Sequence, residues 1–111
     1  MGNGEHIEVS GENFQEEVLK SEQLVIVDFW ASWCGPCLVM APLVESMARK
    51  YAGRLKVAKV NVDNNADLAR RYEVRSIPTL LFLKRGELED RIVGRITVEE
   101  LEERIAGLLR T

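Results

Sequence analysis

The two cysteines of the chain, Cys34 and Cys37, enclose Gly35 and Pro36 at a point where an apolar run gives way to a helical pattern. Residues three apart on a helix are neighbours, with Cβ atoms roughly 5–6 Å apart, and a disulfide requires a Cβ separation of about 3.5–4.5 Å. A slightly deformed first helical turn can therefore open and close a disulfide at little cost. Glycine accepts unusual dihedrals, and proline is tolerated in the first turn of a helix.

This position of the cysteines predicts their chemistry. The N-terminus of a helix has unpaired N–H groups and a partial positive charge, which both stabilise a thiolate over a thiol. We expect Cys34 to be the exposed nucleophile, and Cys37, one turn further, to be the more buried resolving thiol. The other hypotheses are half of a zinc site and a static disulfide. Zinc usually takes four ligands, and beyond the cysteines the only histidine of the chain is His6.

Two charged residues lie among apolar neighbours in segments that we expect to be strands. Asp28 interrupts the apolar run 24–31, and Lys59 lies within the run 55–62. Asp28 could simply be a strand-end acid satisfied by hydrogen bonds, and Lys59 a lysine that extends its ammonium group to solvent. If Asp28 is buried without a cation, its pKa is raised, and it can then exchange a proton near neutral pH.

Three segments together resemble the thioredoxin family: Val27-Asp28-Phe29-Trp30-Ala31, Trp33-Cys34-Gly35-Pro36-Cys37 and the distant Ile77-Pro78-Thr79. The resemblance extends from about Ile7 to Leu109. It implies a thiol–disulfide oxidoreductase, a protein-disulfide reductase that works by reversible oxidation of the Cys34 and Cys37 dithiol through a mixed disulfide. Two alternatives stay open, which are an oxidase or isomerase on the same fold and a non-enzymatic binding subunit.

The resemblance also assigns roles to single residues. The family's counterpart of Asp28 lies beneath the second cysteine and acts as its acid and base, and the counterpart of Lys59 approaches that carboxylate. The counterpart of Pro78 is cis and faces the cysteines, so that the flanking backbone can pair with an extended substrate segment. The expected substrate-binding surface consists of Trp33, Gly35, Pro36, Ile77, Pro78, Val93 and Gly94. Leu38 and Arg95 border this surface and depart from the commonest family pattern, which leaves the choice of partner open.

Cofactors and partners follow from the same resemblance. No bound cofactor or metal is expected beyond the redox-active disulfide of Cys34 and Cys37. The electrons are expected to come from a thioredoxin reductase and to pass to disulfide-containing proteins, with this chain acting as a monomer in electron transport and cell redox homeostasis.

The elements that must position these residues can be read in chain order. Hydrophobic periodicity predicts strands at 6–9, 24–30, 55–62, 79–84 and 89–93, and helices at 13–20, from 35 to about 51, at 64–72 and from 97 onward. Thr97 and Glu100 form a capping-box pattern before the last helix. The order predicts an α/β protein, and the resemblance specifies a thioredoxin fold. That fold has three α/β/α layers, with a central mixed five-stranded sheet flanked by four helices in one domain over residues 1–111.

Composition limits the partners and the cellular location that we expect for the protein. The 111 residues carry a net charge of −3, and the pI near 5.2 argues against nucleic acid or an anionic membrane as the main partner. No apolar run approaches the roughly 20 residues of a membrane span. The segment Met1–His6 lacks a basic stretch followed by an apolar one, so no signal peptide is visible and we expect a cytoplasmic protein.

Overall fold

The computed structural model describes residues 6–111 and contains one mixed five-stranded sheet. Its strands lie in the order β1-β3-β2-β4-β5, with β1, β3 and β2 parallel, β4 antiparallel to β2, and β5 antiparallel to β4. The strand bounds are β1 Ile7–Glu8, β2 Leu24–Trp30, β3 Leu55–Asn61, β4 Thr79–Lys84 and β5 Glu87–Val93. This is the predicted sheet. The predictions that concern residues 1–5 lie outside the described part of the chain.

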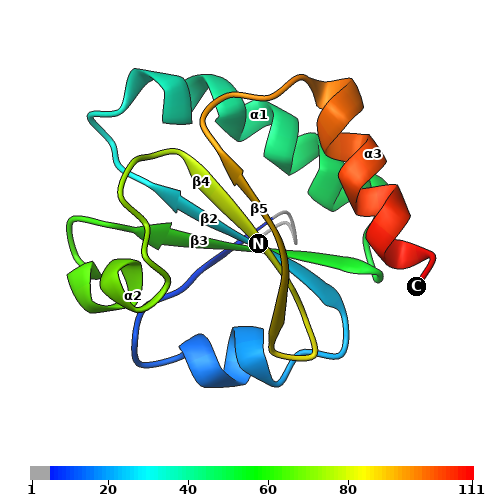
Figure 1. Ribbon diagram of the computed structural model, residues 1–111, viewed down its shortest axis with the longest axis horizontal. Coiled ribbons are helices and arrows are strands. Elements are labelled where there is room, and N and C mark those ends of the chain that lie inside the picture. The colour runs from blue at the N-terminus through cyan, green and yellow to red at the C-terminus, as the bar shows by residue number, and fades with distance from the viewer. Residues whose placement is uncertain (1–5) are drawn as a thin grey trace.

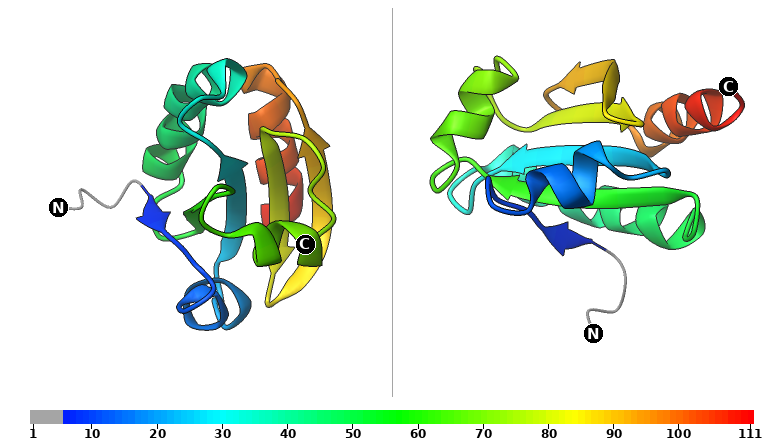
Figure 2. Two further views of the ribbon diagram at one scale, coloured as in Figure 1. Left: turned by 90° about the vertical axis from the view of Figure 1, so that its left-hand side faces the viewer. Right: turned by 90° about the horizontal axis from the view of Figure 1, so that it is seen from below.

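Within residues 6–111, four helices cover the two faces of the sheet and complete the three predicted layers. Helices α1 (Gly35–Lys50) and α3 (Val98–Leu109) lie on one side, while η1 (Gln15–Leu19) and α2 (Ala66–Arg71) lie on the other (Figures 1 and 2). The predicted capping box opens α3, since the Thr97 side chain accepts from the Glu100 N–H and the Glu100 carboxylate accepts from the Thr97 N–H. The fold is therefore the expected α/β/α arrangement.

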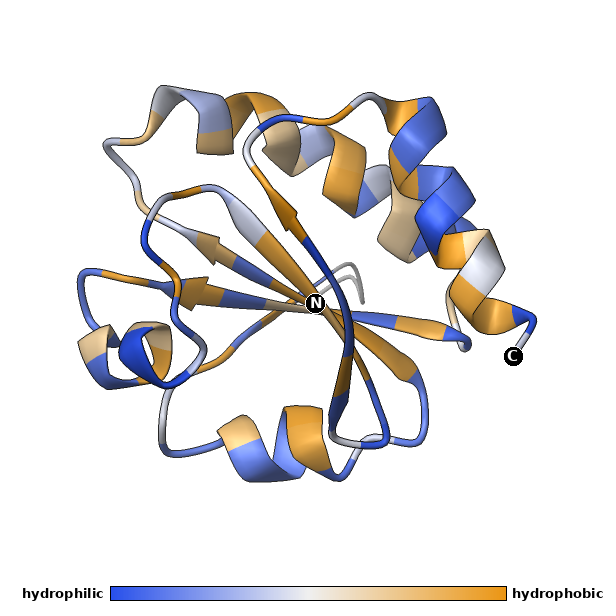
Figure 3. Cartoon of the chain, viewed as in Figure 1, coloured by the Kyte–Doolittle hydropathy of each residue, from blue (hydrophilic) through white to orange (hydrophobic). Residues whose placement is uncertain are grey.

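The continuous apolar run of β2 is explained by a sheet that is buried on both faces. Leu24 and Ile26 pack in a core with α1 and α3, whereas Val25, Val27 and Phe29 pack in a second core with η1 and α2. Figure 3 shows hydrophobic residues along the central strands and many hydrophilic residues on α3. Because side chains alternate along a strand, Asp28 lies on the same face as Leu24 and Ile26, beneath α1.

Two local structures differ from the sequence-based expectation. The first helix is a short π-helix, in which the Lys20 N–H donates to the Gln15 carbonyl oxygen at 3.0 Å, five residues earlier. The hairpin between β4 and β5 closes with Arg85 and Gly86 alone, so β5 begins earlier than expected. Both residues have positive φ, +51° and +83°, as a two-residue type I′ turn requires.

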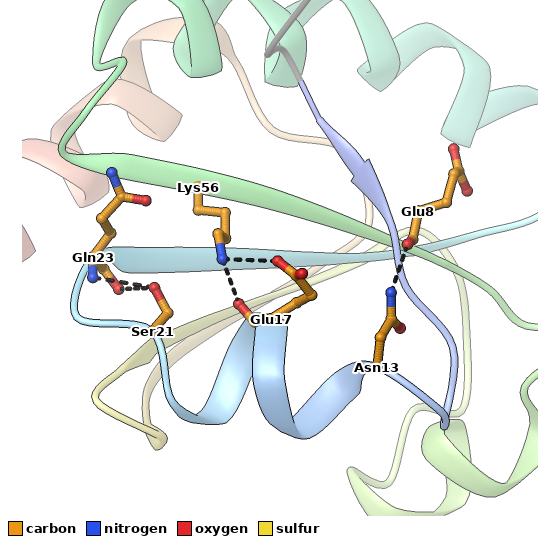
Figure 4. A network of polar contacts seen from close by, with 6 residues as sticks. All are labelled: Glu8, Asn13, Glu17, Ser21, Gln23 and Lys56. Carbon is orange, nitrogen blue, oxygen red and sulfur yellow. Dashed lines mark hydrogen bonds and ion pairs between the residues drawn. The ribbon is translucent and has the colours of Figure 1, made fainter. Parts of the chain in front are cut away.

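Polar contacts fasten η1 and the chain before it to the sheet (Figure 4). The Lys56 ammonium donates to the Glu17 carbonyl oxygen at 2.8 Å and lies 3.1 Å from the Glu17 carboxylate. The Asn13 amide donates to the Glu8 carbonyl oxygen at 3.3 Å. The Lys56 contacts hold η1 against β3, on the face opposite α1, and the Asn13 contact joins the chain before η1 to β1. Within residues 6–111, no helix combines the length and the apolar character needed to cross a membrane.

Candidate active site

The two cysteines form a disulfide where β2 leads into α1. Their Cα atoms are 5.3 Å apart, and Cys34 is the N-cap of α1 with an extended backbone. The Cys34 sulfur accepts a hydrogen bond from the Cys37 N–H at 3.2 Å. Pro36 lies in the first turn, where its missing N–H leaves no helical bond unmade. The predicted place of the pair, at the first turn of a helix, is confirmed.

The prediction that Cys34 is exposed is wrong for this disulfide-bonded form. Cys34 is 5% exposed and Cys37 is 4% exposed, so neither is the more accessible by any useful margin. The sulfur of Cys34 is joined to Cys37, and both side chains pack against Ala31 with Trp30 and Ile77 alongside. Spacing alone could not reveal this burial, because two of the residues packed against the pair, Val62 and Ile77, are distant in the chain.

Within residues 6–111, no group of three or more histidine, cysteine, aspartate or glutamate side chains is placed to hold a metal ion. The two sulfurs are bonded to each other, and metal ligation needs free thiolates.

Asp28 is buried on the α1 side of β2, near its carboxyl end. Burial is the main cause that raises the pKa of its carboxyl group from about 3.8 to about 6. The positive charge of Lys59 opposes this shift, and the negative charge of Glu45 adds to it. A carboxyl group with this pKa can take up and release a proton close to neutral pH.

Lys59 is a register partner of Asp28 across the parallel β2–β3 pair, as the resemblance implies. Lys59 is buried, with 8% of its surface exposed. The ammonium nitrogen lies 4.7 Å from the ring centroid of Trp30, in a cation–π arrangement. Sequence reasoning had assigned no contact between these two residues.

Among the predicted substrate-binding residues, Gly35 and Pro36 lie between the two cysteines and Ile77 packs against them, while Pro78 is buried. Trp33 is 68% exposed, its indole N–H donates to Asp63 at 3.0 Å, and Gly35, Pro36 and Val93 are also exposed. The Ile77–Pro78 peptide bond is cis, as the resemblance implies. The Gly94 N–H donates to the Pro78 carbonyl oxygen at 2.8 Å, which places the start of β4 beside the end of β5.

A surface hollow next to Trp33 contains residues that sequence reasoning missed. It has a volume of about 340 Å³ and a mainly apolar lining, formed by Trp33, Val62, Ala69, Val74, Arg75, Ser76 and Ile77. Val62 and Ile77 also pack against the cysteine cluster, so the hollow adjoins the disulfide. Apart from Ala69, which lies in α2, the only sequence signal for the missed residues was their position in loops that follow strands and helices, and such a position is common to many residues without function.

Comparisons with known proteins agree with this geometry. The thioredoxin family model matches residues 5–107. A thioredoxin of Chlorobaculum thiosulfatiphilum is 44% identical over 102 residues, which cover 92% of this chain and 94% of that protein. A thioredoxin of Acidithiobacillus ferridurans is 50% identical over 93 residues, 84% of this chain and 86% of its own. A thioredoxin of Pseudomonas aeruginosa is 46% identical over 98 residues, 87% of this chain and 91% of its own.

Proposed function

Because the chain belongs to the thioredoxin family and is a thiol–disulfide oxidoreductase that reduces protein disulfides, we propose that Cys34 and Cys37 are its reacting residues, with Cys34 as the attacking thiolate. The observation that carries this proposal is the disulfide at the first turn of α1. In the reduced protein, the N–H groups and the partial positive charge of this helix end stabilise a thiolate at Cys34. The Cys37 N–H, which donates to the Cys34 sulfur in the disulfide, is placed to contribute.

The reaction proceeds in two exchanges. The Cys34 thiolate attacks one sulfur of the substrate disulfide, a mixed disulfide forms, and the other substrate sulfur leaves as a thiolate that takes a proton from water. Cys37 then gives its proton to the Asp28 carboxylate and attacks the Cys34 sulfur. The second substrate sulfur leaves as a thiolate and is protonated in turn. The substrate has gained two electrons and two protons, and the Cys34–Cys37 disulfide has formed.

Asp28 is proposed as the acid and base of the second exchange. Its place beneath α1 and its pKa of about 6 support this role. The carboxyl group is ionised at neutral pH, and its pKa is close enough to neutral pH for the group to return the proton. Lys59 is proposed to act through Asp28, because its charge favours the carboxylate that accepts the proton.

The substrate is proposed to bind as an extended segment over the disulfide. The exposed Trp33 and Val93 provide apolar contact, and the substrate is proposed to pair in a strand-like way with the backbone before the cis Ile77–Pro78 bond. Gly35, Pro36, Ile77 and Gly94 complete this surface. Leu38 and Arg95 are exposed near it and are proposed to influence the choice of partner.

The setting of the reaction is proposed from the family. The oxidised chain receives electrons from a thioredoxin reductase and passes them to disulfide-containing proteins, so that it works as an electron carrier. We propose that residues 1–111 form one domain that acts as a monomer in the cytoplasm and needs no bound cofactor.

A pair of cysteine variants tests the roles of the two thiols. Cys34→Ser should abolish turnover of a disulfide substrate such as insulin, whereas Cys37→Ser should accumulate a mixed disulfide visible by mass spectrometry. Sustained multiple turnover by Cys34→Ser would contradict the proposal. If both variants kept the biological activity of the protein, a non-enzymatic binding role would explain it better.

The reduction potential of the disulfide tests the direction of the reaction. Equilibration with dithiothreitol and glutathione buffers should give a value well below the glutathione poise, which is about −220 to −260 mV by extraction methods. A potential above this range would favour the oxidase or isomerase alternative.

A further inference from the structure

A row of charged side chains crosses the sheet under α1. Glu8 on β1 pairs in register with Lys59 on β3, and Lys59 pairs with Asp28 on β2. Register partners in a sheet point to the same face, so the three side chains share the face that α1 covers. His6 precedes Glu8 by two residues and therefore lies on this face as well.

Helix α1 adds a fourth charged group above this row. The Glu45 carboxylate lies 2.5 Å from Nδ1 of His6, and Nε2 of His6 lies 3.0 Å from the Glu8 carboxylate. Side-chain exposure rises along this series, from 17% for Glu45 to 32% for His6 and 67% for Glu8. Glu45 is therefore the least exposed of these three side chains, and the contact with His6 fixes the position of its carboxylate.

The contact with His6 uses one carboxylate oxygen of Glu45, Oε2, and leaves the other oxygen, Oε1, outside that contact. Oε1 is buried and accepts no hydrogen bond from the described residues 6–111. A buried oxygen without a hydrogen-bond donor costs free energy. The negative charge of Glu45 also acts on Asp28, which is buried in the low-dielectric region under α1.

The charges that act on Asp28 come from three elements. They are Lys59 on β3, Glu45 on α1, and Glu8 on β1 together with His6 just before that strand. From β4 its register partner is the uncharged Leu80. Lys59 and His6 favour the ionised carboxyl group, and the two glutamates disfavour it.

We propose that Glu45, held in place by His6, is a positioning residue for Asp28, and that its charge sets the pH range in which Asp28 exchanges the Cys37 proton. This inference rests on the proposed acid–base role of Asp28. It assigns a part in the reaction to the contact between β1 and α1, away from the cysteines and from the substrate-binding surface.

The direct test is a titration of the Asp28 carboxyl carbon by 13C NMR in the oxidised protein. Glu45→Gln removes the negative charge at nearly constant shape, so the midpoint should move to lower pH by about half a unit. Glu45→Asp keeps the charge and should stay close to the wild-type midpoint. Glu16→Gln is the matched control, because Glu16 is an exposed glutamate on the opposite face, paired with Lys20. An Asp28 midpoint that is the same in Glu45→Gln and wild type would overturn the inference.

A kinetic readout separates this inference from the role of Asp28 itself. The rate at which Cys37 resolves a mixed disulfide is measured from pH 5 to pH 9 in wild type, Glu45→Gln and Asp28→Asn. We expect the acidic limb of the profile to move to lower pH in Glu45→Gln and to disappear in Asp28→Asn. If Asp28→Asn loses the limb while Glu45→Gln keeps it unmoved, the inference fails and the role of Asp28 stands. If Asp28→Asn keeps the limb, the role of Asp28 fails, and the kinetic part of the inference fails with it.

Discussion

Lys59 lies directly opposite Asp28 in the parallel pairing of β2 and β3, while its ammonium nitrogen lies 4.7 Å from the centroid of the Trp30 ring. The cation is therefore held by an aromatic face and acts on Asp28 as a neighbouring charge. This charge lowers the pKa of Asp28, but the desolvation that raises it is larger, and the pKa is about 6. Burial and the charge of Lys59 are thus the two largest influences on the protonation of Asp28.

The buried carboxylate of Asp28 should make stability depend on pH. Its pKa is about 6 in the folded protein and about 3.9 in the unfolded chain, so the folded state binds the proton more tightly. Its contribution to stability is highest below about pH 4 and is lost as the pH rises through 6. At pH 8 the cost is about 3 kcal/mol, at 1.36 kcal/mol per pKa unit.

Asp28→Asn should therefore be more stable than wild type at pH 8, and this advantage should shrink by about 2 kcal/mol at pH 4.5. Urea denaturation at the two pH values measures the difference. Asp67→Asn is the control, because Asp67 is exposed and its ion pair with Arg70 lies at the surface. Equal stability differences at both pH values would show that Asp28 has an ordinary pKa.

Lys59→Met should shift the acidic limb of mixed-disulfide resolution to higher pH. The substitution removes the charge that favours the Asp28 carboxylate and keeps an apolar stem over Trp30. The direction is opposite to that expected for Glu45→Gln. Lys56→Met is the matched control, since Lys56 lies on the same strand but pairs with Glu17 on the other face. If both lysine variants shift the profile alike, the effect is one of net charge and not of position.

Trp33→Ala should weaken substrate binding without unfolding the protein. The side chain is exposed, so little buried area is lost, but exposed tryptophans at binding surfaces often carry much of the binding energy. We expect kcat/KM for a protein disulfide to fall about tenfold, mainly through KM, which corresponds to about 1.4 kcal/mol. Leu88→Ala is the control, because Leu88 is an exposed apolar residue at the far end of β5. An unchanged KM would remove Trp33 from the proposed surface.

Gly86→Ala should destabilise the protein more than Gly53→Ala. Both glycines have a left-handed backbone, with φ of +83° and +88°, so alanine is strained at each by about 1 kcal/mol. A Cβ at Gly86 would lie 3.0 Å from the Leu19 carbonyl oxygen, whereas at Gly53 it would meet no atom within 4 Å. We expect a total cost of about 2–3 kcal/mol for Gly86→Ala, measured by urea denaturation. Equal costs would show that η1 can move away from the hairpin.

Much of the architecture could be predicted from the chain because it follows from local patterns. The apolar run of β2, the periodicity of α3 and the capping box at Thr97 depend on neighbours in sequence, and the structure has each of them. The same holds for the helix start at Cys34 and Cys37, since two cysteines three apart with Gly and Pro between them already specify a turn that can hold a disulfide.

Packing between distant segments decided what local patterns could not. The cluster of Cys34 and Cys37 packs against Val62 and Ile77 from distant parts of the chain, and Val62 and Val74 both line the hollow beside Trp33. The pKa of Asp28 depends on how much water the covering elements exclude and on charges from three of them. His6, which the sequence left without a role, reaches Glu45 only because β1 joins the sheet under α1. Sequence determined which groups can react, and tertiary structure determined their burial and their electrostatic neighbours, since both are set by residues far apart in the chain.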